Sequence, residues 1–159
     1  MKYDEALRVI SMLNPAFVEY IEDPVMDIEE LVKLSENVDV RIALDEFITT
    51  ENVETLLDIP SINYFVIKPM KFGFYRTLEI LQAAESKNKS VVISSVFESA
   101  VGRSGLVYLA SLIKGSRAHG LGTKNFLMED LDDNIYPCDK PIIEFKSNNY
   151  PPVFNIEVF

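Results

Sequence analysis

The stretch Ile42-Ala43-Leu44-Asp45-Glu46 decides the fold, because an apolar run ends there directly in two carboxylates. Similar apolar runs that end in polar residues precede and follow it, at Tyr20-Ile21-Glu22 and at Val66-Ile67-Lys68. The steps from Glu22 to Asp45 and from Asp45 to Lys68 are both 23 residues long. One strand, one helix and two short loops fill a repeat of this length. The repeat therefore predicts alternating strands and helices.

The intervals between these runs carry apolar residues at helical spacing. Asp27 with Glu30 three residues later is a capping-box pattern, which predicts that a helix begins there. The predicted strands are Phe17–Ile21, Val38–Leu44, Tyr64–Ile67 and Ser90–Ile93, with a weaker fifth repeat that ends at Gly120.

The composition limits the classes of function. The chain has 159 residues, of which 48% are hydrophobic, enough for one domain with a sizeable core. A formal net charge of −10 repels phosphate backbones and anionic lipid surfaces, so we expect neither nucleic acid nor membrane as a partner. Cys138 is the single cysteine, which fits a reducing compartment and predicts a cytoplasmic protein.

Alternating strands and helices predict a parallel sheet covered by helices, and two architectures fit this pattern. An open doubly wound sheet is complete with five strands, whereas a closed eight-stranded barrel needs about 250 residues. Length favours the open sheet. Polar residues at the ends of successive strands favour the barrel, because barrel enzymes gather catalytic groups from many strands.

Glu22 and Asp45 follow neighbouring predicted strands, which lie about 4.8 Å apart in a sheet. Two converging carboxylates suit Mg²⁺, which prefers oxygen ligands. The alternative is that both acids stay solvated and stabilise the helices that follow them.

The remaining candidate residues also stand near strand ends. Lys68 could act as an acid, a base or an electrostatic stabiliser, or it could simply pair with Asp45. Ser94 and Ser95 have no base beside them in the sequence, so substrate hydrogen bonding suits them better than nucleophilic catalysis. His119 is either packed or on the surface, and it attracts attention only because it precedes Gly120.

Five motifs follow one another in order, and together they carry a family resemblance. They are Tyr20-Ile21-Glu22-Asp23-Pro24, Ala43-Leu44-Asp45-Glu46, Val66-Ile67-Lys68-Pro69, Ile93-Ser94-Ser95-Val96-Phe97-Glu98-Ser99 and Gly120-Leu121-Gly122-Thr123. In order and spacing, residues 14 to 125 resemble the enolase superfamily, and within it the o-succinylbenzoate synthase family.

The resemblance implies an α/β fold that is the C-terminal part, about strands 4 to 8, of an enolase-superfamily (β/α)8 barrel. A short irregular or β-hairpin tail would follow. The implied domains are a partial barrel over residues 1–130 and a tail over residues 131–159, which packs on the barrel or on a missing or partner domain.

The same resemblance implies a lyase of menaquinone biosynthesis that uses Mg²⁺ to dehydrate a small carboxylate substrate through an enediolate. Asp23 and Glu46 would serve as caps or support the metal ligands. The implied site residues are Glu22 and Asp45 as metal ligands, Lys68 as catalytic residue, and Ser94, Ser95 and Gly120 as substrate contacts.

The family's third metal ligand and its second-strand Lys-x-Lys pair find no counterpart between Met1 and the first predicted strand. We therefore expect the 159-residue chain to be inactive alone and to need its missing amino-terminal half or a second copy. Two alternatives remain open, which are a racemase or cycloisomerase acting on acylamino acids, dipeptides or muconate, and a non-catalytic α/β module.

Overall fold

The structure is a computed structural model of the chain and describes residues 1–115, 117–132, 135–136 and 142–145. The chain divides into two compact units. Unit 1 contains Met1–Ile67 and Tyr75–Val91, and unit 2 contains Lys68–Phe74 and the described residues from Val92 onward. No helix in the described part of the chain is long and apolar enough to cross a membrane.

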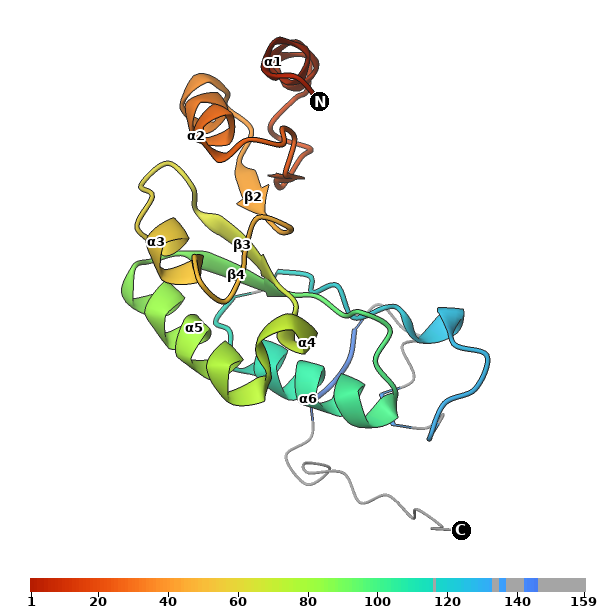
Figure 1. The fold of residues 1–159 in the computed structure, drawn as a ribbon. Helices are drawn as coiled ribbons and strands as arrows, with labels where there is room; N and C mark the ends of the chain where they lie inside the picture. Colours follow the sequence, from red (N-terminus) through yellow and green to blue (C-terminus); the bar gives the residue numbers. More distant parts are fainter. Residues whose placement is uncertain (116, 133–134, 137–141, 146–159) are drawn as a thin grey trace. The chain divides into compact units, whose positions relative to one another are not determined.

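Helices and strands alternate along the chain, as the repeat predicts (Figure 1). In chain order the elements are α1 (Tyr3–Ser11), β1 (Ile21–Glu22), α2 (Ile28–Asn37), β2 (Ile42–Leu44), α3 (Val53–Leu57), β3 (Tyr64–Ile67), α4 (Pro69–Phe72), α5 (Phe74–Ser86), β4 (Ser90–Ile93), α6 (Ala100–Ser111) and the 3-10 helix η1 (Lys124–Phe126).

The four strands form one sheet in the order β1-β2-β3-β4. β1 pairs with β2 in parallel, with Glu22 opposite Ala43, and β2 pairs with β3 in parallel, with Ala43 opposite Tyr64. Every residue of β2 and β3 is buried, which is typical of parallel strands covered on both faces. The predicted α/β class with parallel strands is confirmed.

The fifth repeat forms less regular structure than the others. Gly120 makes an isolated parallel bridge with Ser94 in unit 2, directly after β4. The main-chain bonds of this bridge run from Gly120 N–H to Ile93 O and from Ser95 N–H to Gly120 O, each 2.8 Å. The predicted strand is thus reduced to one bridged residue that still lies parallel to the end of β4.

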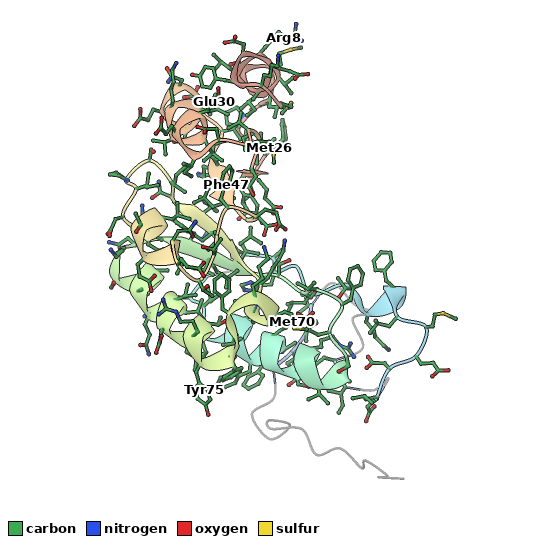
Figure 2. The ribbon with its side chains drawn as sticks, in the orientation of Figure 1. Arg8, Met26, Glu30, Phe47, Met70 and Tyr75 are labelled. Atoms are coloured by element: carbon green, nitrogen blue, oxygen red, sulfur yellow. The ribbon has the colours of Figure 1, made fainter. Side chains whose placement is uncertain are left out.

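Within unit 1, α1 and α2 pack against each other. Ala6 and Ile10 of α1 and Leu31 and Leu34 of α2 are buried. The predicted cap of α2 is confirmed, because the Asp27 side chain accepts bonds from Glu29 N–H and Glu30 N–H. Figure 2 shows the side chains, with Glu30 on α2 and Phe47 in the turn after β2.

The predicted strand Phe17–Ile21 is wrong for most of its length, since β1 contains only Ile21 and Glu22. A turn replaces its first part, because Asn14 O accepts a bond from Phe17 N–H and the Asn14 side chain accepts one from Ala16 N–H. Phe17 is 87% exposed, so no packing holds it in an extended strand.

The sequence predicts an irregular or β-hairpin tail. Residues 142–145 are irregular, which agrees with the alternative prediction of an irregular tail. The rest of the predicted tail from residue 146 onward and Cys138 lie outside the described residues.

Candidate functional site

Glu22 and Asp45 both belong to unit 1 and lie at the carboxyl ends of adjacent parallel strands. Glu22 is opposite Ala43 in the register, and side chains in a strand alternate between faces. Asp45 comes two residues after Ala43, directly past the end of β2. Glu22 is exposed and Asp45 is half-buried. The two predicted metal ligands thus lie at the same end of two paired strands.

Asp23 connects the ends of β1 and β2. Its N–H donates to Ala43 O at 3.1 Å, and its carboxylate accepts bonds from Asp45 N–H at 3.2 and 3.3 Å and from Glu46 N–H at 2.6 Å. Burial raises the pKa of the Asp23 carboxyl above its ordinary value, and it outweighs the amides of Glu46 and Asp45, which lower the pKa. The hydrogen bonds from Asp45 N–H and Glu46 N–H to the Asp23 carboxylate are consistent with the predicted role of Asp23 in supporting the metal ligands.

Carboxylate oxygens at one strand end are the donors that Mg²⁺ prefers, so Glu22 and Asp45 fit that ion chemically. They supply two carboxylates. Among the described residues, no group of three or more His, Cys, Asp and Glu side chains could hold a metal ion. A complete site would need further oxygen ligands.

Lys68 belongs to unit 2 and directly follows β3 in the chain. It is the N-cap residue of α4, and its φ of −101° and ψ of 97° keep its backbone extended. Pro69 at the first helical position requires this, because proline disfavours a helical conformation in the residue before it. The side chain of Lys68 is half-buried. Its catalytic role stays a prediction.

Unit 2 brings Ser94, Ser95 and Gly120 together, although more than 20 residues of chain separate the serines from the glycine. A Cβ atom on Gly120 would lie 2.9 Å from Ser94 Oγ, so the absence of a side chain there makes room for the Ser94 hydroxyl. The Ser95 hydroxyl donates to Gly120 O at 2.8 Å and lies 2.9 Å from Thr123 Oγ1. Ser95 therefore joins two segments, and the roles of Ser94, Ser95 and Gly120 as substrate contacts stay a prediction.

His119 is packed rather than fully exposed, which resolves one alternative left by the sequence. Its Nδ1 accepts a bond from Ile93 N–H at 3.1 Å, so the neutral ring carries its proton on Nε2. Burial lowers the pKa of His119 below its ordinary value. The ring thus helps to join the segment before Gly120 to the end of β4.

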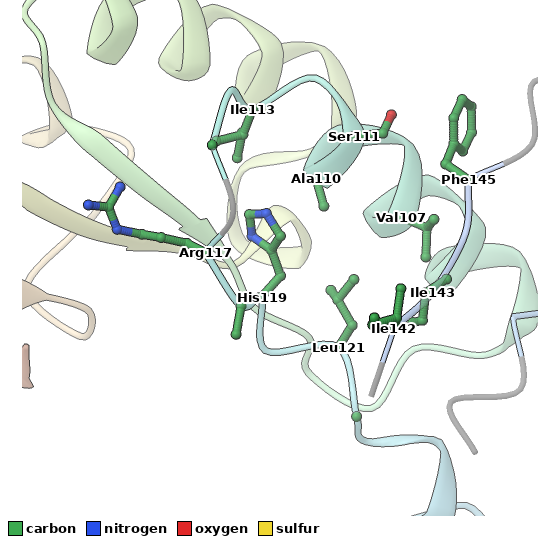
Figure 3. Close-up of a pocket in the computed structure, with 13 residues that line it drawn as sticks. Val107, Ala110, Ser111, Ile113, Arg117, His119, Leu121, Ile142, Ile143 and Phe145 are labelled. Atoms are coloured by element: carbon green, nitrogen blue, oxygen red, sulfur yellow. The ribbon is translucent and has the colours of Figure 1, made fainter. Parts of the chain in front are cut away.

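A cavity of about 690 Å³ lies in unit 2 beside His119. Figure 3 shows Val107 and Ala110 of α6 lining it together with His119 and Leu121. Ile142, Ile143 and Phe145 also line it. Ser94, Ser95 and Gly120 do not line this cavity, so it is separate from the predicted substrate contacts of unit 2.

A buried ion pair in unit 2 has no counterpart in the sequence-based predictions. Arg103 of α6 and Asp130 approach to 2.8 Å, and each side chain is only 2% exposed. The Asp130 carboxylate also accepts Ala100 N–H at 2.6 Å, at the start of α6. The available signal was Arg103 itself, which is the only charged residue in α6.

Comparison with known proteins identifies the family. The model of the enolase C-terminal domain-like family matches residues 1–142. The chain is 32% identical over 142 residues to the o-succinylbenzoate synthase of Thermobifida fusca, which covers 88% of this chain and 42% of that protein. It is 31% identical over 152 residues to the protein PHYLLO, chloroplastic, of Arabidopsis thaliana, which covers 81% of this chain and 9% of that protein.

Solved structures share the fold. MenC from Desulfotalea psychrophila superposes with a TM-score of 0.74 at 24% identity, over 84% of this chain and 39% of that one. A mandelate racemase/muconate lactonizing enzyme from Roseiflexus superposes with a TM-score of 0.71 at 27% identity, over 82% of this chain and 38% of that one. The chain spans less than half the length of each of these relatives. The resemblance inferred from the five motifs is confirmed, and the chain belongs to the enolase C-terminal domain-like family.

Proposed function

We propose that the complete protein containing this chain is an o-succinylbenzoate synthase-like lyase, which dehydrates a small carboxylate substrate in menaquinone biosynthesis. The observation that carries the proposal is the placement of Glu22 and Asp45 at the carboxyl ends of adjacent parallel strands. The o-succinylbenzoate synthases from Thermobifida fusca and Mycobacterium bovis, at 32% and 35% identity, support the choice of reaction. The single cysteine supports a cytoplasmic location.

Each proposed residue has its own role. Glu22 and Asp45 would hold Mg²⁺, which when bound supplies Lewis-acid stabilisation of the negative charge that develops on the substrate carboxylate. Lys68 would add a positive charge that stabilises the enediolate. Ser94, Ser95 and Gly120 would contact the substrate, and the absence of a side chain on Gly120 leaves room for the Ser94 hydroxyl.

The domain prediction is retained as part of the proposal, with a partial barrel over residues 1–130 and a tail over residues 131–159. Arg103 supports it, because this residue of α6 donates from Nε to Tyr136 O at 2.9 Å and from Nη2 to Ile135 O at 3.1 Å. The described start of the tail therefore contacts a helix of the proposed barrel segment.

The test uses the complete protein with Mg²⁺ and measures dehydration of the succinyl-hydroxycyclohexadiene carboxylate to o-succinylbenzoate. Lewis-acid stabilisation is worth several kcal/mol, so Glu22→Gln and Asp45→Asn should each lower kcat by about 10³-fold or more. Asp39→Asn is the matched control, because it removes one negative charge from an exposed position of the same unit. Full dehydration activity in Asp45→Asn would contradict the proposal.

A second candidate function is racemisation or cycloisomerisation, favoured by the 27% identity to the mandelate racemase/muconate lactonizing enzyme from Roseiflexus. The complete protein that contains this chain should therefore also be assayed with N-succinyl amino acids, dipeptides and muconate. Turnover of one of these substrates without dehydration would replace the lyase by this alternative.

The 159-residue chain alone should show no turnover, because it supplies two of the three carboxylates and no second-strand lysine pair. The measurement is the same dehydration assay on the purified chain at saturating Mg²⁺. Adding a separately expressed amino-terminal part should restore activity if the two parts associate. Turnover by the isolated chain would show that the missing groups are unnecessary.

A further inference from the structure

The turn after β1 contains a non-glycine residue with unusual backbone geometry. Asp23 has a φ of +36°, in the left-handed region that non-glycine residues seldom adopt. Asp and Asn tolerate this region better than other side chains, because their short polar groups bond to nearby main chain. Backbone strain of this kind persists only where the surrounding contacts compensate for it.

The compensating contacts all lead to the end of β2. The main chain of Asp23 bonds to Ala43 O, and its carboxylate bonds to the amides of Asp45 and Glu46. The two amides lie 22 and 23 residues from Asp23 in the sequence. One residue therefore fixes the exit of β1 and the exit of β2 against each other.

The same contacts separate Asp23 from the two neighbouring acids. Both of its carboxylate oxygens accept hydrogen bonds from main-chain amides, so this side chain stabilises the backbone. The turn that it binds begins at Asp45 and is closed by a bond from Ile48 N–H to Asp45 O at 3.2 Å. Glu22 immediately precedes Asp23 in the chain, and Asp45 donates its N–H to the Asp23 carboxylate. Asp23 is therefore linked directly to both candidate metal ligands.

We propose that Asp23 is a positioning residue that clamps the turn carrying Asp45 to the strand end carrying Glu22, and thereby presets the spacing between these two carboxylates for a divalent cation. The inference rests on the proposed function, in which both carboxylates bind Mg²⁺. In this inference Asp23 sets the spacing between the Glu22 and Asp45 carboxylates, although Asp23 does not itself bind the ion.

Two substitutions separate the clamp from the backbone strain. Asp23→Gly removes the carboxylate and also relieves the left-handed φ, so a purely conformational role predicts equal or greater stability. Asp23→Asn keeps the size and the tolerance of positive φ but loses the negative charge that strengthens the bonds to the amides. Asp39→Asn is the charge-matched control in unit 1.

The experiment measures Mg²⁺ affinity of the complete protein by calorimetry and amide hydrogen exchange of Asp45 and Glu46 by NMR in Mg²⁺-free buffer. Residues that orient metal ligands change affinity by roughly 10- to 100-fold when replaced. We expect that loss in both Asp23 variants, a lower thermal midpoint in Asp23→Gly because the Asp45 and Glu46 amides lose their acceptor, and wild-type affinity in Asp39→Asn. The two amides should exchange at least about tenfold faster in Asp23→Gly.

The outcomes distinguish the inference from the function on which it rests. Wild-type protein that fails to bind Mg²⁺, or Asp45→Asn protein that still binds it normally, overturns the proposed metal site. If the wild type binds Mg²⁺ and Asp45→Asn does not, the metal site stands. Wild-type affinity and unchanged amide exchange in Asp23→Gly would then overturn the clamp alone.

Discussion

At the scale of single residues, Arg103 carries a deeply buried charge in unit 2. It contacts Asp130 and the carbonyls of Ile135 and Tyr136, and Asp130 in turn accepts the Ala100 amide at the start of α6. A buried charge is tolerated only when it is paired and hydrogen-bonded. This pair therefore joins α6 to the segment from Asp130 to Tyr136.

Removing one partner of this ion pair should destabilise unit 2. Arg103→Met or Asp130→Asn leaves the other charge buried without its counter-ion, which costs about 3–5 kcal/mol. The double variant should cost less than the sum of the single variants, because no unpaired charge remains. Urea denaturation of the four proteins measures the free energies of unfolding. Additive effects would contradict a direct ion pair.

The stability supplied by Asp130 should depend on pH. Burial alone raises its pKa, but the Ala100 amide, Arg103 and the Leu131 amide outweigh burial, and the pKa lies below its ordinary value of 3.8. The Asp130 carboxyl therefore binds protons more readily in the unfolded chain than in the folded protein. Its contribution to the free energy of unfolding is present above about pH 4 and is lost as the pH falls through the lower pKa of the folded protein. The difference in unfolding free energy between wild type and Asp130→Asn should therefore shrink below about pH 4. A difference that is constant from pH 3 to pH 7 would contradict this.

At the scale of elements, the start of α2 is the clearest local signal. Asp27 Oδ1 accepts Glu29 N–H at 2.9 Å and Glu30 N–H at 3.0 Å. Asp27→Ala removes this cap and should lower the free energy of unfolding by about 1 kcal/mol, whereas Asp27→Ser should retain most of it. Chemical denaturation and the helical circular dichroism signal measure both variants. Equal stability of the alanine and serine variants would argue against capping.

The sequence predicted some elements to the residue. β3 coincides with a run of aromatic and β-branched residues that is buried throughout, and β4 adds the half-buried Ser90 to a buried run of β-branched residues, so burial leaves a nearly continuous apolar signal. Phe17 misled the prediction, because an apolar side chain close to an apolar run resembles a strand residue. The Asn14 turn holds it outside the sheet, and only hydrogen bonds show that.

At the scale of the whole molecule, β1 is the first strand in the order β1-β2-β3-β4 and pairs only with β2 among the described residues. An open strand edge exposes main-chain donors and acceptors that favour pairing with another chain. The isolated 159-residue chain should therefore self-associate, or bind a separately expressed amino-terminal part, at micromolar concentrations. Sedimentation velocity measures both. A chain that stays monomeric and does not bind the amino-terminal part would favour an open sheet that is complete by itself.

The amino-acid sequence by itself determined the alternation of strands and helices, the parallel class of the sheet, the cap of α2 and the five motifs that place the chain in its family. These features depend on local periodicity and on residue types at short spacing, which the printed chain displays directly. Only the tertiary structure decided that Asp23 bonds to the turn of Asp45, that Ser95 joins Gly120, and that Arg103 binds Asp130. Each of these contacts joins residues 22 to 27 positions apart, and no local pattern specifies which distant partner satisfies a buried polar group.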